Sequence, residues 1–447
     1  MASVNYRPAS LRVKSYSKGP LDWILSAPLS TVVGLTLITI VAFLNAVDVS
    51  IDKDKVGLDA QVMLKLLGIG FAGIYGGIGF LTDRRVRDLV QSFPVFWVVL
   101  IIAMYFLSVP FSIDPKVSLA STLSMVAVLL LTLRALVQIG ILPVLNAIFV
   151  GMGLFNVLSW VVFFLWPAVG VLEEPLPDGK FALRMSGLAH SNVLGQYSGL
   201  TVVLGTIMAF TYKKRSGMRI GLIVVALGAL VCSLSRTSLA ATVFALVIAY
   251  RRVFFKREYL RRYVVATMVG VFAMLLISTQ VDLGAKIKEK MTLVSKSGDA
   301  EELTSATGRA EIWAYAIRLL GQRPLIGYGA ATSKHYLARY SSYTHNMILN
   351  VAFSTGLIGG LACLVMVLGR VRAMFKISHP LADGILVFII VNGFFENVIF
   401  AIIVGMPTMV WIMSLSWPLL KDDPLVDSTT GELKEFEMSE GRLRFSP

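Results

Sequence analysis

The chain has 447 residues, of which 56% are apolar and only 15% are charged, and its net charge is +14. A soluble domain carries nearer a quarter charged residues, and the apolar residues here gather in blocks of about 20, the length of helix that crosses a bilayer. The composition therefore excludes a soluble fold and predicts an all-α polytopic membrane protein. In such a protein the basic residues gather in the cytoplasmic loops and so indicate the topology. The positive charge therefore does not indicate a nucleic acid partner.

Apolar runs predict about 12 transmembrane helices along the chain. The runs lie at about 24–47, 62–81, 89–109, 117–134, 143–170, 193–212, 220–234, 238–250, 263–278, 346–368, 384–398 and 401–420. Placing the N-terminus in the cytoplasm puts most of the 41 Lys and Arg residues into short cytoplasmic segments, as the positive-inside rule requires. The sequence thus predicts a protein of the bacterial inner membrane with both termini cytoplasmic.

This topology divides the chain into five parts. They are a cytoplasmic segment (1–22), nine spans (23–278), a large periplasmic loop (279–345), three spans (346–420) and a cytoplasmic tail (421–447) predicted to be disordered. Within the large loop, apolar residues recur at helical spacing from Arg309 to Gln322. We expect this helix to lie along the membrane surface as a lid over a cleft. Cys232 and Cys363 fall in apolar runs and are interpreted as small core residues.

Four polar clusters lie on the periplasmic side of this topology. They are Arg184 to Asn192, Ser235-Arg236, Thr307-Gly308-Arg309 and Thr344-His345-Asn346. Each resembles a helix start, where unpaired backbone N–H groups favour anions, and arginine adds a fixed fork of donors for phosphate oxygens. Helix capping and snorkelling explain any one cluster more simply. The four together favour a diphosphate site.

Histidine is rare in the chain, with four residues. His345 is predicted at a helix start, where the helix dipole favours neutral imidazole, the form that a general base needs. A purely structural capping role stays open for it. His190 and His335 are weaker candidates, and His379 is interpreted as a cytoplasmic loop residue.

The first periplasmic loop raises the question of a metal. Asp52-Lys53-Asp54 has the Asp-X-Asp form that can hold a cation with a sugar diphosphate. The interleaved Lys53 and Lys55 would repel a cation, so we predict neither a metal nor another cofactor. Lys65, which lies within an apolar run, receives no role.

The order of several motifs resembles the O-antigen ligase and polymerase superfamily over about 180–365. The motifs are Arg184…Asn192, Ser235-Arg236, Thr307-Gly308-Arg309…Trp313, Pro324-Leu325-Ile326-Gly327-Tyr328-Gly329 and His345-Asn346. The resemblance implies a metal-independent membrane glycosyltransferase of GT-C-like helical architecture. It also implies a saccharide donor carried on undecaprenyl diphosphate and an acceptor that is either lipid A–core or a growing glycan.

The same resemblance assigns roles to particular residues. Arg236 and Arg309 would be the functional arginines, with Arg184 assisting, and they would bind the donor diphosphate and stabilise its charge as the carrier leaves. His345 would take the proton from the acceptor hydroxyl in an inverting displacement. The supporting residues would be Asn192, Ser235, Thr307 and Asn346.

Three other interpretations remain open. A transporter or flippase of lipid-linked saccharides would suit about 12 spans, although no internal repeat of the transporter kind is visible. A metal-dependent glycosyltransferase would use Asp52 and Asp54, and a non-enzymatic scaffold would use the cytoplasmic loops. Ligase and polymerase would share the donor site, and we lean toward a polymerase or a role in exopolysaccharide synthesis.

Overall fold

A computed structural model describes most of the chain. The described residues are 28–48, 60–175, 181–212, 216–251, 309–341, 343–376, 379–400, 404–416, 436–439 and 442–445. The predicted span at 263–278, the loop residues 279–308 and the N-terminal segment 1–22 lie outside them.

The described residues are almost entirely helical, as the composition predicts. The longer apolar helices are α2 (Leu29–Leu44), α3 (Ala60–Thr82), α5 (Phe93–Ser108), α6 (Pro115–Gln138), α7 (Ile141–Leu165), α9 (Ser191–Phe210), α10 (Gly217–Cys232), α11 (Arg236–Ala249), α18 (Met347–Lys376), α19 (Pro380–Gly393) and α20 (Met406–Ser416). Shorter helices are α4 (Arg84–Val90), η1 (Val109–Phe111), α8 (Pro167–Gly170), α16 (Arg309–Leu320) and α17 (Ser333–Leu337). Two antiparallel hairpins, which the sequence does not predict, pair β1 (Val171–Pro175) with β2 (Phe181–Met185) and β3 (Phe436–Ser439) with β4 (Arg442–Phe445). The second hairpin falls in the tail for which the sequence predicts disorder.

The helices can be compared with the predicted membrane spans. Within the described residues, a helix overlaps each predicted apolar run except 263–278, which lies outside them. In the described part of the chain, 6 helical segments are long and apolar enough to cross a membrane: α3, α5 continued by η1, α6, α7, α9 and α18. The helix α20 has 11 residues and extends about 16 Å at 1.5 Å per residue, about half of the bilayer core.

The outer surface of the bundle is apolar, as a lipid-facing surface must be. On α3, Leu67, Phe71, Ile74 and Ile78 recur three or four residues apart and are between 49% and 62% exposed. Soluble proteins rarely expose a continuous apolar stripe of this length. The stripe and the long apolar helices together indicate a multi-pass membrane protein.

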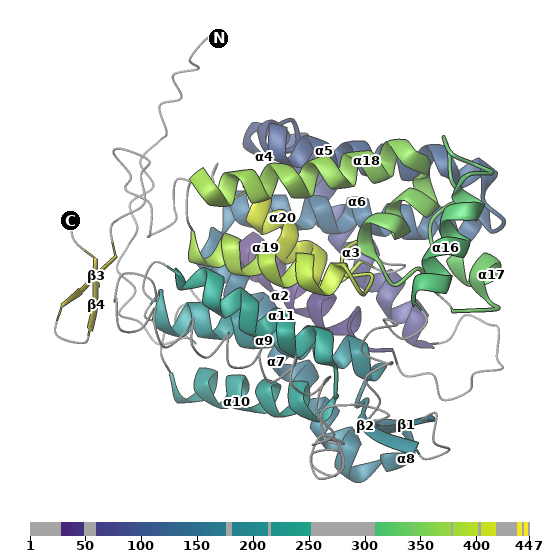
Figure 1. The fold of residues 1–447 in the computed structure, drawn as a ribbon. Coiled ribbons are helices and arrows are strands. Elements are labelled where there is room, and N and C mark those ends of the chain that lie inside the picture. Colours follow the sequence, from purple (N-terminus) through teal and green to yellow (C-terminus); the bar gives the residue numbers. More distant parts are fainter. Residues whose placement is uncertain are drawn as a thin grey trace.

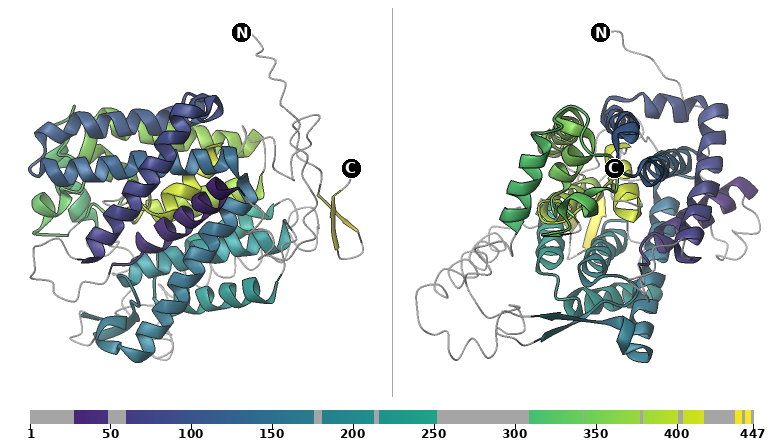
Figure 2. Two further views of the ribbon diagram at one scale, coloured as in Figure 1. Left: turned by 180° about the vertical axis from the view of Figure 1, so that it is seen from behind. Right: turned by 90° about the vertical axis from the view of Figure 1, so that its right-hand side faces the viewer.

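The helices run roughly side by side, with α9 enclosed in the middle. α9 packs against α7, α10, α11 and α19, while α18 packs along α5 on another side of the bundle (Figure 1). Seen from behind, α3 crosses the longer helices obliquely (Figure 2). Because α9 is so enclosed, polar side chains in its first turns lie inside the protein rather than in lipid or water.

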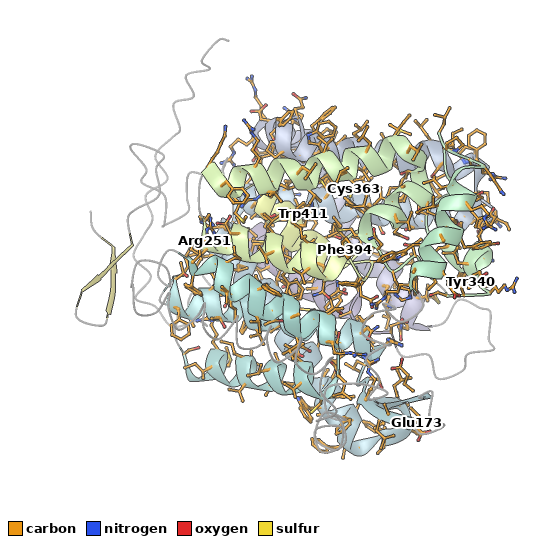
Figure 3. All side chains as sticks on the ribbon, in the orientation of Figure 1. Glu173, Arg251, Tyr340, Cys363, Phe394 and Trp411 are labelled. Carbon is orange, nitrogen blue, oxygen red and sulfur yellow. The ribbon has the colours of Figure 1, made fainter. Side chains whose placement is uncertain are left out.

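A buried ionic cluster fastens one end of the bundle, where Arg251 lies (Figure 3). Asp383, in the first turn of α19, is fully buried and accepts from Arg251 at 2.8 Å and from Arg370 at 3.2 Å. His379 is likewise buried and caps α19 by accepting from the backbone N–H of Ala382. His379 therefore holds a helix start at this end.

Replacing the shared carboxylate should destabilise the protein. Asp383→Ala leaves two arginines without their buried counter-charge, and breaking such a pair costs about 3–5 kcal/mol. We expect a clearly lower melting temperature in detergent. Asp88→Ala is the matched control, because Asp88 pairs with Arg84 on an exposed helix face at 4.0 Å, where ion pairs contribute little. Equal melting temperatures for the two variants would contradict a clamping role for Asp383.

Candidate active site

The described residues of the clusters that the sequence singles out lie at the opposite end of the bundle from Arg251 (Figures 1 and 3). Here α9, α11 and α18 begin, and α19 ends at Gly393. The chain then continues as irregular backbone through residues 394–400, in which Val398, Ile399 and Phe400 are buried. The predicted span at 384–398 is therefore interrupted, and irregular backbone enclosed by helices carries Glu396 into the bundle end. Such backbone is tolerated at membrane depth only where protein or a water-filled cavity surrounds it.

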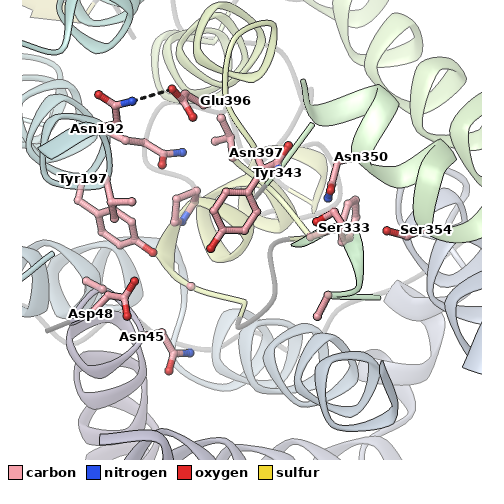
Figure 4. Close-up of a pocket in the computed structure, with 18 of the residues that line it drawn as sticks. Asn45, Asp48, Asn192, Tyr197, Ser333, Tyr343, Asn350, Ser354, Glu396 and Asn397 are labelled. Carbon is pink, nitrogen blue, oxygen red and sulfur yellow. Dashed lines mark hydrogen bonds between the residues drawn. The ribbon is translucent and has the colours of Figure 1, made fainter. Parts of the chain in front are cut away.

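Glu396 is the residue on which the candidate side chains converge. Its Oε1 accepts from Nη2 of Arg309 at 2.9 Å. The same oxygen accepts from Nδ2 of Asn192 at 3.0 Å (Figure 4). Its Oε2 lies 3.0 Å from Nδ1 of His345. One carboxylate, whose side chain is 15% exposed, thus joins an arginine of α16, an amide of α9 and a histidine of the irregular segment just before α18.

The surroundings of Glu396 keep it ionised. Burial of the carboxyl acts to raise its pKa, but the hydrogen bond from His345 and the electrostatic influence of its neighbours, Arg309 among them, outweigh this effect. The pKa of Glu396 consequently lies below its ordinary value of 4.5. The carboxylate is therefore an acceptor at neutral pH and a fixed counter-charge for Arg309.

This contact also assigns the proton of His345. An ionised carboxylate accepts but cannot donate, so a neutral His345 carries its proton on Nδ1. Its Nε2 is then the basic nitrogen, and it lies 2.8 Å from the hydroxyl of Ser341, which donates to it. Neutral imidazole with a free lone pair on Nε2 is the form required of a general base.

The backbone around His345 is constrained. His345 has a φ of +49°, in the left-handed region that non-glycine residues seldom adopt. The indole of Trp313 donates to the carbonyl of Thr344 at 2.9 Å, and the amide of Asn346 donates to the carbonyl of Phe394 at 3.1 Å. Asn346 also caps α18, which begins two residues after His345, by accepting from Leu349. These contacts hold the imidazole against Glu396, which is how strained backbone commonly persists at active sites.

Arg184 lies behind this arrangement rather than at its surface. It sits on β2, is 1% exposed, and donates to the carbonyl of Ser233 at 2.9 Å. It also donates to Glu174 and to Oδ1 of Asn192, both at 2.6 Å. Each nitrogen of its guanidinium therefore has a protein acceptor. Arg184 fixes Asn192, which in turn contacts Glu396.

Arg236 is the first residue of α11 and is half-buried. Ser235, just before it, donates to Ser238, and Ser238 donates to the amide oxygen of Asn392 at 3.1 Å. Asn392 is four residues from Glu396 in the chain. This relay ties the start of α11 to the end of α19 and so brings Arg236 to the same end of the bundle as the other candidates.

The remaining candidates are distributed more widely. Thr307, Asp52 and Asp54 lie outside the described residues. His190 and His335 are exposed, and Nδ1 of His190 accepts from the backbone of Asn192. Among the residues that the structure describes, no group of three or more His, Cys, Asp or Glu side chains is placed to hold a metal ion.

The Gly327-Tyr328-Gly329 motif makes contact with protein backbone. Tyr328 and Gly329 donate their N–H groups to the carbonyls of Phe353 and Ser354, just before a break in α18 at Gly356, which has a φ of +81°. A Cβ on Gly327 would lie 2.6 Å from the carbonyl oxygen of Phe353. Glycine is required here because two backbones touch, and the contact anchors the chain between α16 and α18.

Sequence reasoning missed Glu396, the centre of the site. It assigned residues 384–398 to a continuous span, within which a single carboxylate near the end was not considered. The signal was available, because an ionisable residue in an otherwise apolar run marks function more often than structure. The neighbouring Asn392 and Asn397 strengthen that signal.

One comparison with known families supports the resemblance that the sequence suggests. Residues 221–365 match a family model described as O-Antigen ligase. The matched segment contains Arg236, Arg309 and His345, whereas Arg184 and Asn192 precede it and Glu396 follows it. A search of curated proteins found no significant match.

Proposed function

We propose, from the premise that residues 221–365 form a domain of the O-antigen ligase superfamily, that the chain is a membrane glycosyltransferase of the ligase or polymerase type. Its donor would be a saccharide on undecaprenyl diphosphate, and its acceptor a lipid A–core or a growing glycan. The observation that carries the proposal is the carboxylate of Glu396, which holds Arg309 on one oxygen and His345 on the other. The guanidinium that would bind the leaving diphosphate and the imidazole that would take the acceptor proton are thereby kept together.

The arginines bind the donor diphosphate in this mechanism. Arg309 uses one nitrogen on Glu396 and retains further N–H donors, and Arg236 begins a helix at the same end of the bundle. Both stabilise the charge that develops on the leaving diphosphate. Arg184, whose nitrogens already have protein acceptors, assists by fixing Asn192 against Glu396.

His345 acts as the general base. The acceptor hydroxyl takes the place of the Ser341 hydroxyl at Nε2, and its oxygen attacks the anomeric carbon from the face opposite the diphosphate. The bond from that carbon to the diphosphate oxygen breaks, and its electron pair leaves with undecaprenyl diphosphate. The acceptor proton passes to Nε2, and Glu396 stabilises the imidazolium through Nδ1. The product has inverted anomeric configuration.

The chemistry requires no metal in this proposal. Metal-dependent enzymes neutralise a diphosphate with a metal ion held by carboxylates, whereas here the carboxylate of Glu396 holds the guanidinium of Arg309. The donor supplies its own driving force through the sugar–diphosphate bond. The site faces the periplasm, because the topology that obeys the positive-inside rule places all four clusters on that side.

Arg309→Ala should reduce saccharide transfer about 30- to several-thousand-fold, because losing a buried arginine–phosphate contact costs about 2–5 kcal/mol. The assay uses purified protein in detergent, a polyprenyl-diphosphate oligosaccharide and excess chelator. Arg318→Ala is the matched control, since Arg318 lies exposed on the same helix. The control should transfer as well as the unmodified protein.

Three outcomes distinguish the interpretations. Transfer that persists in chelator and is lost in Arg309→Ala supports the proposal. Transfer abolished by chelator and restored by a divalent cation would establish a metal-dependent enzyme. Donor binding without transfer by the unmodified protein would favour a transporter of lipid-linked saccharides.

A further inference from the structure

A cavity of about 280 Å³ lies beside Glu396 (Figure 4). Its volume is close to the lower end of the roughly 300–1,000 Å³ of small-molecule sites. Residues from α3, α5, α9 and α18 line it, together with the end of α2 and the irregular segment after α19. Glu396, which pairs with Arg309, and Asn192, which donates to Glu396, both belong to this wall. Glu396 therefore links the cavity to Arg309, a residue of the proposed diphosphate site.

The wall of the cavity is rich in amides and hydroxyls. Asn45, Gln196 and Asn350 contribute amides, and the hydroxyls of Tyr197 and Tyr343 point toward its interior (Figure 4). Amides donate and accept at once, and tyrosine adds a flat apolar face to a polar tip. These groups match a sugar ring, which presents hydroxyls at its edge and C–H groups on its faces.

Gln196 gives a second, independent indication of a ligand. It lies in the second turn of α9, is 6% exposed, and its Nε2 has no hydrogen-bond partner among the described residues. A buried polar group without a partner costs free energy, so such groups usually have a reason to be there. A ligand hydroxyl in the cavity would supply the missing acceptor once the Gln196 side chain turns toward it.

The charges of the wall exclude the diphosphate from the cavity. Asp48 and Glu396 are acidic and Lys65 is the one basic residue among those lining it, so the wall has a formal charge of −1. Desolvation and the nearby Asp48 raise the pKa of Tyr343, so its hydroxyl stays protonated and can donate. An anionic group would be repelled here, whereas an uncharged ring would not.

We propose that this cavity is a subsite for an uncharged sugar ring, which occupies it while the diphosphate lies on the arginines. The inference rests on the proposed glycosyltransferase function. The ring would come either from the donor, as the sugar attached to the diphosphate, or from the acceptor, as its terminal sugar. Gln196, Tyr343 and Asn350 would bind its hydroxyls.

Gln196→Leu tests the subsite, because it removes the amide and keeps a similar volume. In the full-length protein in detergent, we expect a roughly three- to tenfold higher KM for one saccharide substrate. The melting temperature should stay equal or rise, since the variant no longer buries an unpartnered amide. A merely structural role would instead lower the melting temperature and leave both KM values unchanged.

Two further variants sharpen the test. Tyr343→Phe removes one hydroxyl and should raise the KM of the same substrate as Gln196→Leu. Thr201→Val is the matched control on α9, because Thr201 is buried, donates to the carbonyl of Tyr197 and does not line the cavity. Its KM values should be unchanged.

The substrate whose KM rises identifies the source of the ring: the donor for the sugar on the diphosphate, the acceptor for the terminal sugar. Unchanged KM values for both substrates in Gln196→Leu and Tyr343→Phe would overturn the subsite. That result would not contradict the proposed transferase function. If the unmodified protein transfers nothing, the proposed function fails first. Binding of oligosaccharide released from the lipid carrier then decides the subsite, which stands only if Gln196→Leu weakens that binding.

Discussion

Glu396→Gln reduces transfer by about a thousandfold or more, the largest loss that we expect from a single substitution. The variant keeps the shape of the side chain but removes the charge that pairs with Arg309 at 2.9 Å and orients His345 at 3.0 Å. Removing the carboxylate that orients a catalytic imidazole costs about 10⁴-fold in serine hydrolases, although the geometry there is retained. The measurement is the initial rate of saccharide transfer from a lipid-linked donor at matched protein concentration.

A double variant shows whether Glu396 acts through His345 or independently of it. If Glu396 acts by orienting His345 and Arg309, then adding Glu396→Gln to His345→Ala should change the rate little, because residues that act as a unit are strongly non-additive. If the rate losses of the two single variants instead multiply in the double variant, this mechanism is contradicted. Glu311→Gln is the matched control, since Glu311 is an exposed carboxylate in the first turn of α16.

The ionisation of Glu396 also gives a pH dependence with a definite sign. Because its pKa lies below the ordinary 4.5, the ionised carboxylate stabilises the folded state above that value, and this contribution is lost as the pH falls through the lowered pKa. The melting temperature of the unmodified protein should therefore exceed that of Glu396→Gln near neutral pH. The difference should stay nearly constant from neutral pH down to about 4.5 and shrink as the pH is lowered further. A difference that grows on acidification would contradict the ionised state.

His345→Ala should reduce transfer about 10²- to 10⁴-fold, the usual contribution of a general base. Donor binding should survive, because the substitution leaves the pairing of Arg309 with Glu396 in place. The loss is therefore expected in kcat, with little change in the KM of the donor. The assay is the same transfer reaction, with donor binding measured separately.

His335→Ala is the matched control for this variant. His335 is exposed on the short helix α17, ten residues earlier in the chain. The His335→Ala variant should therefore transfer saccharide at the rate of the unmodified protein. Normal glycan output from His345→Ala at normal protein levels would remove the histidine from the mechanism. A selective rise in the donor KM would instead indicate a binding role.

The sequence alone was sufficient for the helical architecture. The length and hydropathy of the apolar runs depend on neighbouring residues only, because a helix that crosses lipid must satisfy its own backbone and present apolar side chains. The clusters around Arg184, Arg236, Arg309 and His345 share one end of the bundle because successive helices alternate in direction. The match of residues 221–365 to a family model described as O-Antigen ligase supports the resemblance that the sequence suggests.

The pairings within the site were decided by tertiary structure. Glu396 joins residues that are 51, 87 and 204 positions away, and no local pattern encodes such a contact. The sequence placed Arg184 with the other arginines, but packing of the β1–β2 hairpin buries it behind Asn192. It also treated residues 384–398 as a simple span, whereas α19 ends at Gly393 and the following backbone turns inward. Local periodicity fixes where helices form, and only their packing determines which polar side chains meet.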